Sequence, residues 1–136
     1  MTSLRSELII DPTIVQENIN YLKKLIPVGS KFMAVIKSDA YGHIMENLLE
    51  HIDDFVDGYG TVRIDEAIRI REASNKKILL IGCDLRNPQL HKHIYEDKNA
   101  VGLVNFLVDP AINWRDSVLK KFDNHNRLLI HHPRYD

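Results

Sequence analysis

The chain has one cysteine, one tryptophan and no long apolar run. With Cys83 alone, no internal disulfide and no CxxC metal or redox pair can form, and we interpret this residue as a small apolar side chain. Apolar stretches such as residues 78–81 are far shorter than the ~20 residues that a membrane-spanning helix needs. The N-terminus carries Arg5 and Glu7 in place of an apolar signal core. We therefore expect no membrane partner and a cytoplasmic protein.

An excess of charge of one sign is also missing. The 136 residues include 18 Lys and Arg against 19 Asp and Glu, and no basic block stands out. Because no electrostatic footprint for a phosphate backbone is visible, nucleic acid is not an expected partner. A hydrophobic content of 44% is typical of a soluble globular protein. The length suffices for one core, so residues 1–136 are interpreted as a single domain.

The sequence does contain alternating helix and strand patterns. Asp11 and Pro12 mark the start of an amphipathic helix that ends before Pro27. Residues 31–37, KFMAVIK, form a short apolar run that is typical of a strand buried on both faces of a parallel sheet. Further strands are predicted at 56–62, 77–82, 100–106 and 127–132, with helices near 45–53, 63–73, 87–95 and 109–122.

The spacing of these strands predicts a barrel. Each step between strand ends holds about one strand, one helix and two short loops. A (β/α)8 barrel needs eight such units and typically ~250 residues. The expected fold class is therefore α/β, an incomplete (β/α)8 TIM-type barrel of about five βα units. Such an open sheet leaves unpaired edges at residues 31–37 and 127–132, which a partner chain could cover.

Lys37 stands at the carboxyl end of the first expected strand, before a loop that contains Gly42. Active sites of βα barrels lie at that end of the strands. Partial desolvation there lowers the pKa of a lysine and frees its amine to bond to an aldehyde cofactor. Taken alone, a solvated lysine at a strand end is the more common situation. The neighbouring residues decide between the two interpretations.

The stretch from Ala34 to His43, A-V-I-K-S-D-A-Y-G-H, closely resembles the A-V-V-K-A-N-A-Y-G-H-G signature of alanine racemases, which are fold-type III pyridoxal phosphate enzymes. Residues 58–67, G-Y-G-T-V-R-I-D-E-A, are similar to the family's F-G-V-A-T-L-E-E-A strand and helix start. The resemblance spans at least residues 5–82. The rest of the chain is interpreted by its pattern of elements.

The resemblance implies an activity, a cofactor and two site residues. Lys37 matches the lysine that holds pyridoxal 5'-phosphate and serves as one of two proton-transfer bases. Tyr41 matches the tyrosine that contacts the cofactor phosphate, with a packed aromatic side chain as the alternative. The family converts L-alanine to D-alanine for peptidoglycan, by removing the α-hydrogen and returning it on the opposite face. An amino acid is the implied substrate, and full-length relatives are implied to be homodimers.

The histidines give no indication of a metal site. His43 matches the family's Y-G-H run, and we interpret it as pinning the loop through a hydrogen bond. His91 and His93 are two residues apart, which on a helix turns them to different faces. His131 and His132 point to opposite faces of a strand, and no Cys or carboxylate cluster accompanies them. No metal is expected.

The chain departs from the family pattern in three places. The family follows the histidine with glycine, whereas this chain has Ile44, which removes a conformationally free residue from the turn. After the fifth expected strand the family continues with a D-T-G-M-x-R-type segment, and Arg134 does not align with its arginine. We also expect these residues to lack the family's C-terminal β-domain, which the resemblance implies supplies the second base across a dimer.

Three interpretations follow. The first is a truncated N-terminal part of a pyridoxal phosphate-dependent amino-acid racemase, poorly active or inactive alone, for which serine and other amino acids stay open as substrates. The second is a noncatalytic, degenerate barrel fragment that binds a protein partner through its open edges. The third is a small pyridoxal phosphate homeostasis protein, which the A-Y-G-H run argues against.

Overall fold

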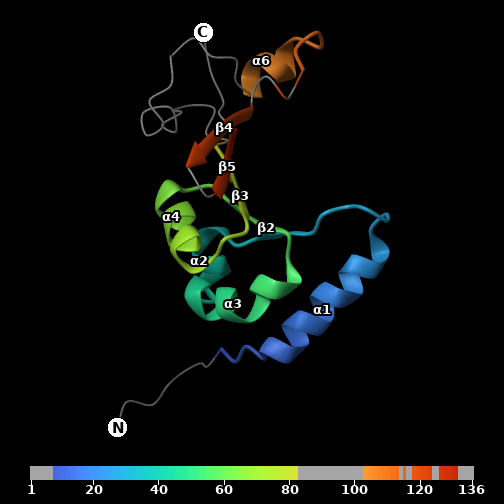
Figure 1. Ribbon diagram of the computed structural model, residues 1–136, viewed down its shortest axis with the longest axis vertical. Coiled ribbons are helices and arrows are strands. Elements are labelled where there is room, and N and C mark those ends of the chain that lie inside the picture. Colours follow the sequence, from blue (N-terminus) through green and yellow to red (C-terminus); the bar gives the residue numbers. More distant parts are fainter. Residues whose placement is uncertain (1–7, 83–102, 114, 116–117, 124–125, 132–136) are drawn as a thin grey trace.

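The computed structural model describes residues 8–82, 103–113, 115, 118–123 and 126–131. Figure 1 shows an α/β arrangement in which the helices of the first half gather beside a twisted sheet. The elements in chain order are α1 (Pro12–Leu25), β1 (Met33–Val35), α2 (Lys37–Gly42), α3 (Met45–Ile52), the 3-10 helix η1 (Asp53–Phe55), β2 (Gly58–Thr61), α4 (Ile64–Ala73), β3 (Lys77–Ile81), α6 (Leu103–Val108), β4 (Val118–Asp123) and β5 (Asn126–His131).

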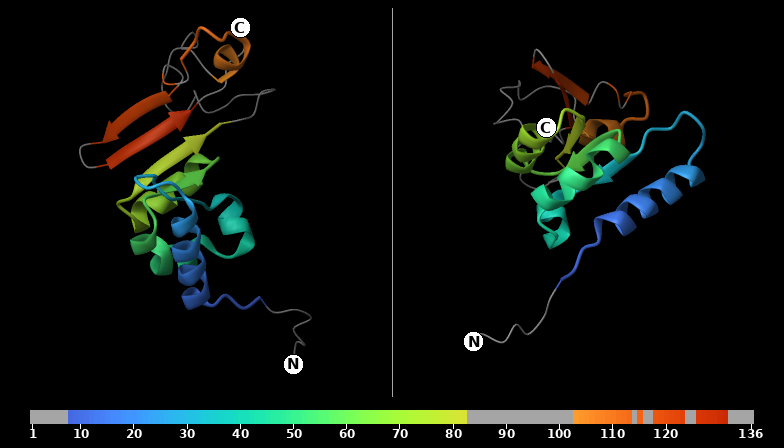
Figure 2. Two further views of the ribbon diagram at one scale, coloured as in Figure 1. Left: turned by 90° about the vertical axis from the view of Figure 1, so that its right-hand side faces the viewer. Right: turned by 60° about the horizontal axis from the view of Figure 1, so that its bottom comes forward.

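The sheet has the strand order β1-β2-β3-β5-β4. β1, β2 and β3 are parallel neighbours, and their register places Val35 beside Gly60 and Gly60 beside Leu79. β5 runs parallel to β3, and β4 lies antiparallel to β5 at the far edge (Figure 2, left). The helical connections between consecutive parallel strands are those of βα units. The predicted α/β class and the first three predicted strands are therefore confirmed.

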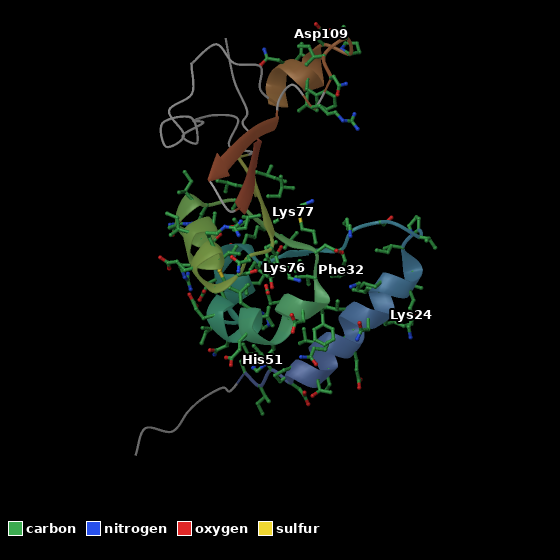
Figure 3. All side chains as sticks on the ribbon, in the orientation of Figure 1. Lys24, Phe32, His51, Lys76, Lys77 and Asp109 are labelled. Atoms are coloured by element: carbon green, nitrogen blue, oxygen red, sulfur yellow. The ribbon has the colours of Figure 1, made fainter. Side chains whose placement is uncertain are left out.

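Helix α1 begins where the sequence predicted. Oδ1 of Asp11 accepts hydrogen bonds from two amides of the first turn, at 2.9 and 3.4 Å, and Pro12 takes the first helical position. Both features satisfy the start of a helix, where backbone amides have no partner within the helix. The helix lies beside α3, because Nε2 of Gln16 donates to the carbonyl oxygen of His51 at 2.7 Å (Figure 3). The predicted helices at 45–53 and 63–73 are confirmed as α3 and α4.

The core lies between these helices and one face of β1, β2 and β3. Its members are Ile19, Ile36, Ala40, Met45, Leu49, Ile52, Val56, Tyr59, Ala67, Ile70 and Ile78. The hydroxyl of Tyr59 donates to Oδ1 of Asp53 at 2.9 Å, which satisfies the polar end of a fully buried ring. Burial, then that hydrogen bond, raises the pKa of Tyr59. On the opposite face of the sheet, Met33 and Val35 remain exposed.

The fourth predicted strand is wrong for the residues that the structure describes. Residues 103–106, part of the strand expected at 100–106, lie in helix α6. The run Leu103–Val108 is six residues long and apolar almost throughout. Such a run has no hydrophobic period that separates a buried strand from a buried helix.

The helix predicted at 109–122 is also wrong, because Val118–Asp123 form strand β4. β4 pairs antiparallel with β5 from Val118 opposite His131 to Asp123 opposite Asn126. It therefore covers the edge that residues 127–132 were expected to leave open. At the other side of the sheet, β1 is an edge strand, as predicted. The regular repeat of five βα units is not confirmed.

Several expectations fall outside the described residues. These are the helix predicted at 87–95 and the interpretations of Cys83, His91, His93, His132 and Arg134. Within the described part of the chain, no helix combines the length and the apolar character needed to cross a membrane.

Candidate active site

A left-handed turn follows β1 and carries the predicted site residues. Lys37 begins α2, and residues 38–41 have φ between 53 and 57° with ψ between 33 and 50°. The amide of Ala40 donates to the carbonyl oxygen of Ile36 at 3.0 Å. Left-handed helical backbone costs roughly 1–2 kcal/mol per L-residue. Since none of residues 38–41 is glycine, contacts from the rest of the fold must stabilise this turn.

The turn brings Lys37 and Tyr41 together. Nζ of Lys37 lies 6.0 Å from the centre of the Tyr41 ring, at the outer limit of a cation–π contact. Lys37 is half-buried, whereas Tyr41 is 59% exposed. Both residues lie at the carboxyl end of β1, where βα barrels place their active sites. The amine therefore lies near the ring of a largely exposed tyrosine.

The buried carboxylate of Glu66 stabilises the turn by accepting a hydrogen bond from its backbone. Glu66, in the first turn of α4, is 3% exposed. Its Oε1 accepts a hydrogen bond from the backbone amide of Asp39 at 3.1 Å, and its Oε2 accepts one from the hydroxyl of Thr61. Glu66 thus connects the middle of the left-handed turn to the last residue of β2.

Arg69 stabilises the same turn through an ion pair with the side chain of Asp39. Nη2 of Arg69 donates to Oδ1 of Asp39 at 2.8 Å, and the guanidinium makes a two-pronged contact with Glu46 at 2.6 and 2.7 Å. Oδ1 of Asp39 also accepts from the amide of Met45 at 3.1 Å. The Met45 amide, then Arg69, lowers the pKa of Asp39, and Arg69 lowers the pKa of Glu46. These charges link α4 to the turn and to the start of α3.

The end of the turn bears out two interpretations made from the sequence. Nδ1 of His43 lies 2.7 Å from the carbonyl oxygen of Ala40, so the predicted hydrogen bond that pins the loop is confirmed. Ile44, which stands where the family has glycine, has a φ of 64° and a ψ of 102°. Positive φ is a conformational outlier for a β-branched residue. The missing glycine therefore leaves local backbone strain.

Gly60 leaves space on the face of the sheet that carries Met33 and Val35. A Cβ on Gly60 would lie 3.3 Å from Cγ2 of Val35 and 3.5 Å from Sδ of Met33, so the three residues share one face. A side chain at Gly60 would fill the space over the carboxyl half of β1 and β2. The exposed side chains of Met33 and Val35 therefore form an apolar surface on this face of the sheet.

Sequence reasoning missed the residues that support this turn. Glu66 lies within residues 58–67, which resemble the family's strand and helix start, but the sequence alone indicates no supporting role for it. A helix-start acid is ordinarily explained by the helix dipole alone. Burial of Glu66 could not be deduced, because its two donors are set by tertiary contacts. Among the described residues, no group of three His, Cys, Asp or Glu side chains could hold a metal.

The fold and site define an α/β protein with a lysine at the carboxyl end of its first parallel strand. A family model described as "Alanine racemase, N-terminal domain" matches residues 10–103. The chain belongs to this family, as its sequence signature predicted.

Relatives and a solved structure support the same assignment. Alanine racemase from Streptococcus gordonii is 40% identical over 78 residues, which is 57% of this chain and 21% of the relative. Alanine racemase from Streptococcus pyogenes serotype M5 is 40% identical over 74 residues, covering 54% and 20%. The crystal structure of alanine racemase from Corynebacterium glutamicum aligns with a TM-score of 0.52 and 25% identity, over 62% of this chain and 24% of that one. The chain thus spans about a fifth of the length of the curated relatives it matches.

Proposed function

We propose that this chain supplies the cofactor lysine of a pyridoxal phosphate-dependent racemase that acts on alanine. The observation that carries the proposal is the position of Lys37. Lys37 begins α2 just beyond the carboxyl end of β1, and its Nζ lies 6.0 Å from the centre of the Tyr41 ring. The chain belongs to the alanine racemase family. An amine at this end of a parallel strand matches where βα barrels concentrate their chemistry.

The residues present fit the cofactor at two of its ends. Nζ of Lys37 would bond to the aldehyde carbon, and the hydroxyl of Tyr41 would donate to the phosphate. The absence of a side chain at Gly60 leaves free the space beside Val35 that a Cβ would fill. Bound pyridoxal phosphate would supply the electron-withdrawing ring that acidifies the α-hydrogen of an amino acid.

Lys37 would also move a proton. With an amino-acid substrate bound, Nζ of Lys37 would accept the α-proton or return it on one face. Inversion needs a second base on the opposite face. We place that base outside this chain, in the remainder of a full-length racemase and across a homodimer.

We further propose that residues 1–136 form one partial TIM-type barrel domain that additional βα units complete. Val35 is 53% exposed and Met33 38% exposed on the face that a barrel would enclose. On α1, Ile14, Tyr21 and Leu25 are all more than half exposed. Apolar side chains on both a sheet face and a helix stripe are normally buried by neighbouring elements. A homodimer and a cytoplasmic location stay predictions from the sequence.

A titration with pyridoxal phosphate tests the cofactor proposal. The purified chain, Lys37→Ala and the control Lys24→Ala receive increasing cofactor while visible absorbance is recorded. Lys24 is an exposed lysine in the last turn of α1 (Figure 3). We expect a saturating spectral change in the first and third samples and none in Lys37→Ala. Equal changes in all three would show unspecific reaction with surface lysines and would overturn the proposal.

The apolar surfaces favour a second candidate, a noncatalytic fragment that binds a protein partner. The open edge of β1 and the exposed Met33 and Val35 could accept a strand and the apolar face of another polypeptide. Mixing the chain with the C-terminal remainder of the Streptococcus gordonii racemase separates the candidates. Recovery of D-alanine formation supports the enzyme, whereas a stable complex without activity or cofactor supports the binding protein.

A further inference from the structure

We infer that Glu66 is a positioning residue for Lys37, acting through the left-handed turn. This inference rests on the proposed function, because Lys37 is the residue that it positions. The physical claim is that the buried carboxylate holds the turn in a conformation that its own residues disfavour. The amine and phenol are then presented together at the end of β1.

The contacts of Glu66 are unusual for an acid at a helix start. Glu66 is the third residue of α4, where a glutamate ordinarily folds back onto the amide of the capping residue. Here Oε1 accepts from the amide of Asp39, 27 residues earlier, and Oε2 accepts from the hydroxyl of Thr61. A carboxylate with 3% exposure is costly to bury unless such donors compensate it. The Asp39 amide and the Thr61 hydroxyl therefore compensate the burial of the Glu66 carboxylate.

The Asp39 amide lies at the centre of the strained segment. Residues 38–41 are all left-handed, so the amide of Asp39 points toward Glu66 only while the turn keeps this hand. Hydrogen bonds to an ionised acceptor are roughly twice as strong as those between neutral groups. Removing the acceptor should release the turn toward the ordinary right-handed region. The close approach of Lys37 and Tyr41 would then be lost.

Arg69 supplies a second restraint on the same residue. It holds the side chain of Asp39, whereas Glu66 holds the main chain. The racemase signature has asparagine at the position of Asp39, which can accept from the Met45 amide but cannot form the ion pair with Arg69. Arg69 is 38% exposed and Glu66 is buried, so we assign the larger effect to Glu66.

Four variants of the full chain isolate this role. Glu66→Ala removes both acceptors. Glu66→Gln keeps a carbonyl oxygen for the Asp39 amide and an amide group for Thr61. Glu72→Ala is the matched control, since Glu72 is an exposed glutamate on the same helix. Ile52→Val, which trims the core by one methylene, controls for a general loss of stability.

Two readouts are measured on each variant. The first is hydrogen exchange at the Asp39 and Ala40 amides, which needs no cofactor. The second is the rate at which pyridoxal phosphate is trapped on Lys37 by borohydride, followed by mass spectrometry of the peptide. We expect Glu66→Ala to accelerate exchange and slow trapping by about tenfold or more. Glu66→Gln, Glu72→Ala and Ile52→Val should stay within about twofold of the parent chain.

The outcomes separate this inference from the proposed function. A protected Asp39 amide in the parent chain without any trapping at Lys37 would overturn the proposed function. Trapping in the parent chain that Glu66→Ala slows no more than Ile52→Val would overturn the positioning role. Should Glu66→Ala fail to fold, Thr61→Val replaces it, because this near-isosteric change removes only the hydroxyl donor. Unchanged exchange at Asp39 and unchanged trapping in Thr61→Val would then contradict the inference.

Discussion

Arg69 and Asp39, thirty residues apart in the sequence, meet through Nη2 and Oδ1 at 2.8 Å. The same guanidinium donates hydrogen bonds to both carboxylate oxygens of Glu46. Each of the three side chains is between about a third and a half exposed, so solvent screens the individual pairs. Their value lies in geometry, because one arginine fixes α4, the turn after Lys37 and the start of α3 to one another.

The first prediction concerns the stability of the folded chain in acid. The pKa values of Asp39 and Glu46 are lowered in the folded chain, so the unfolded chain binds more protons than the folded chain in mildly acidic solution. The stabilisation is present above the ordinary carboxylate pKa of about 4 and is lost as pH falls through the lowered folded values. Arg69→Met should therefore lose less unfolding free energy than the parent chain between about pH 7 and about pH 3.

Urea unfolding at several pH values measures this difference. Lys24→Met is the control for removing a positive charge, because Lys24 lies on α1 and has no part in the Arg69 contacts. Its stability should follow the parent curve at every pH. Parallel curves for Arg69→Met and the parent chain would contradict the role assigned to Arg69.

The second prediction concerns the strained residue that replaces glycine. Ile44 has a φ of 64° and is 52% exposed, so its side chain contributes little core packing that glycine would remove. Ile44→Gly should raise the free energy of unfolding by about 1 kcal/mol, since backbone strain of this kind costs of order 1–3 kcal/mol and glycine recovers part of it. Thermal unfolding measures the change, with Ile14→Gly as a destabilising control inside α1. If Ile44→Gly were less stable than the parent chain, the backbone strain assigned to Ile44 would be contradicted.

The third prediction compares two glycines of β2. A Cβ on Gly58 would lie 2.7 Å from the backbone carbonyl oxygen of Lys77. A Cβ on Gly60 would lie 3.3 Å from the side chain of Val35 and 3.5 Å from that of Met33, with the nearest backbone atom, Cα of Val35, at 3.8 Å. The backbone of β3 at Lys77 cannot move aside as readily as a side chain can. Gly58→Ala should cost about 2 kcal/mol or more and Gly60→Ala clearly less. Chemical unfolding of both variants measures this order, and the reverse order would contradict the described β2–β3 register.

Much of the N-terminal half could be predicted because its signals are local. Asp11 and Pro12 mark the start of α1 through contacts within one helical turn. The runs at 31–37, 56–62 and 77–82 are apolar, short and bounded by turn residues, and the structure places a parallel strand within each. The place of Lys37 after the first of these strands, together with the motif around it, predicts a cofactor lysine there.

The strand predicted at 127–132 is confirmed as β5, whereas α6, β4 and the handedness of the turn could not be predicted. The apolar run at 103–108 fits a helix or a strand, and only its tertiary surroundings decide. The turn at 38–41 consists of residues that avoid left-handed backbone when isolated. It forms because Glu66 and Arg69, 27 and 30 residues away, supply its partners. No pattern within the turn itself carries that information.

Chemical mapping of the cofactor lysine tests the central claim most directly. The chain is incubated with pyridoxal phosphate, reduced with borohydride, digested and analysed by mass spectrometry for modified lysines. We predict one predominant site, Lys37, with Lys24, Lys76 and Lys77 essentially unmodified at stoichiometric cofactor. Modification spread over these lysines without preference for Lys37 would contradict the claim that this chain carries a racemase cofactor site.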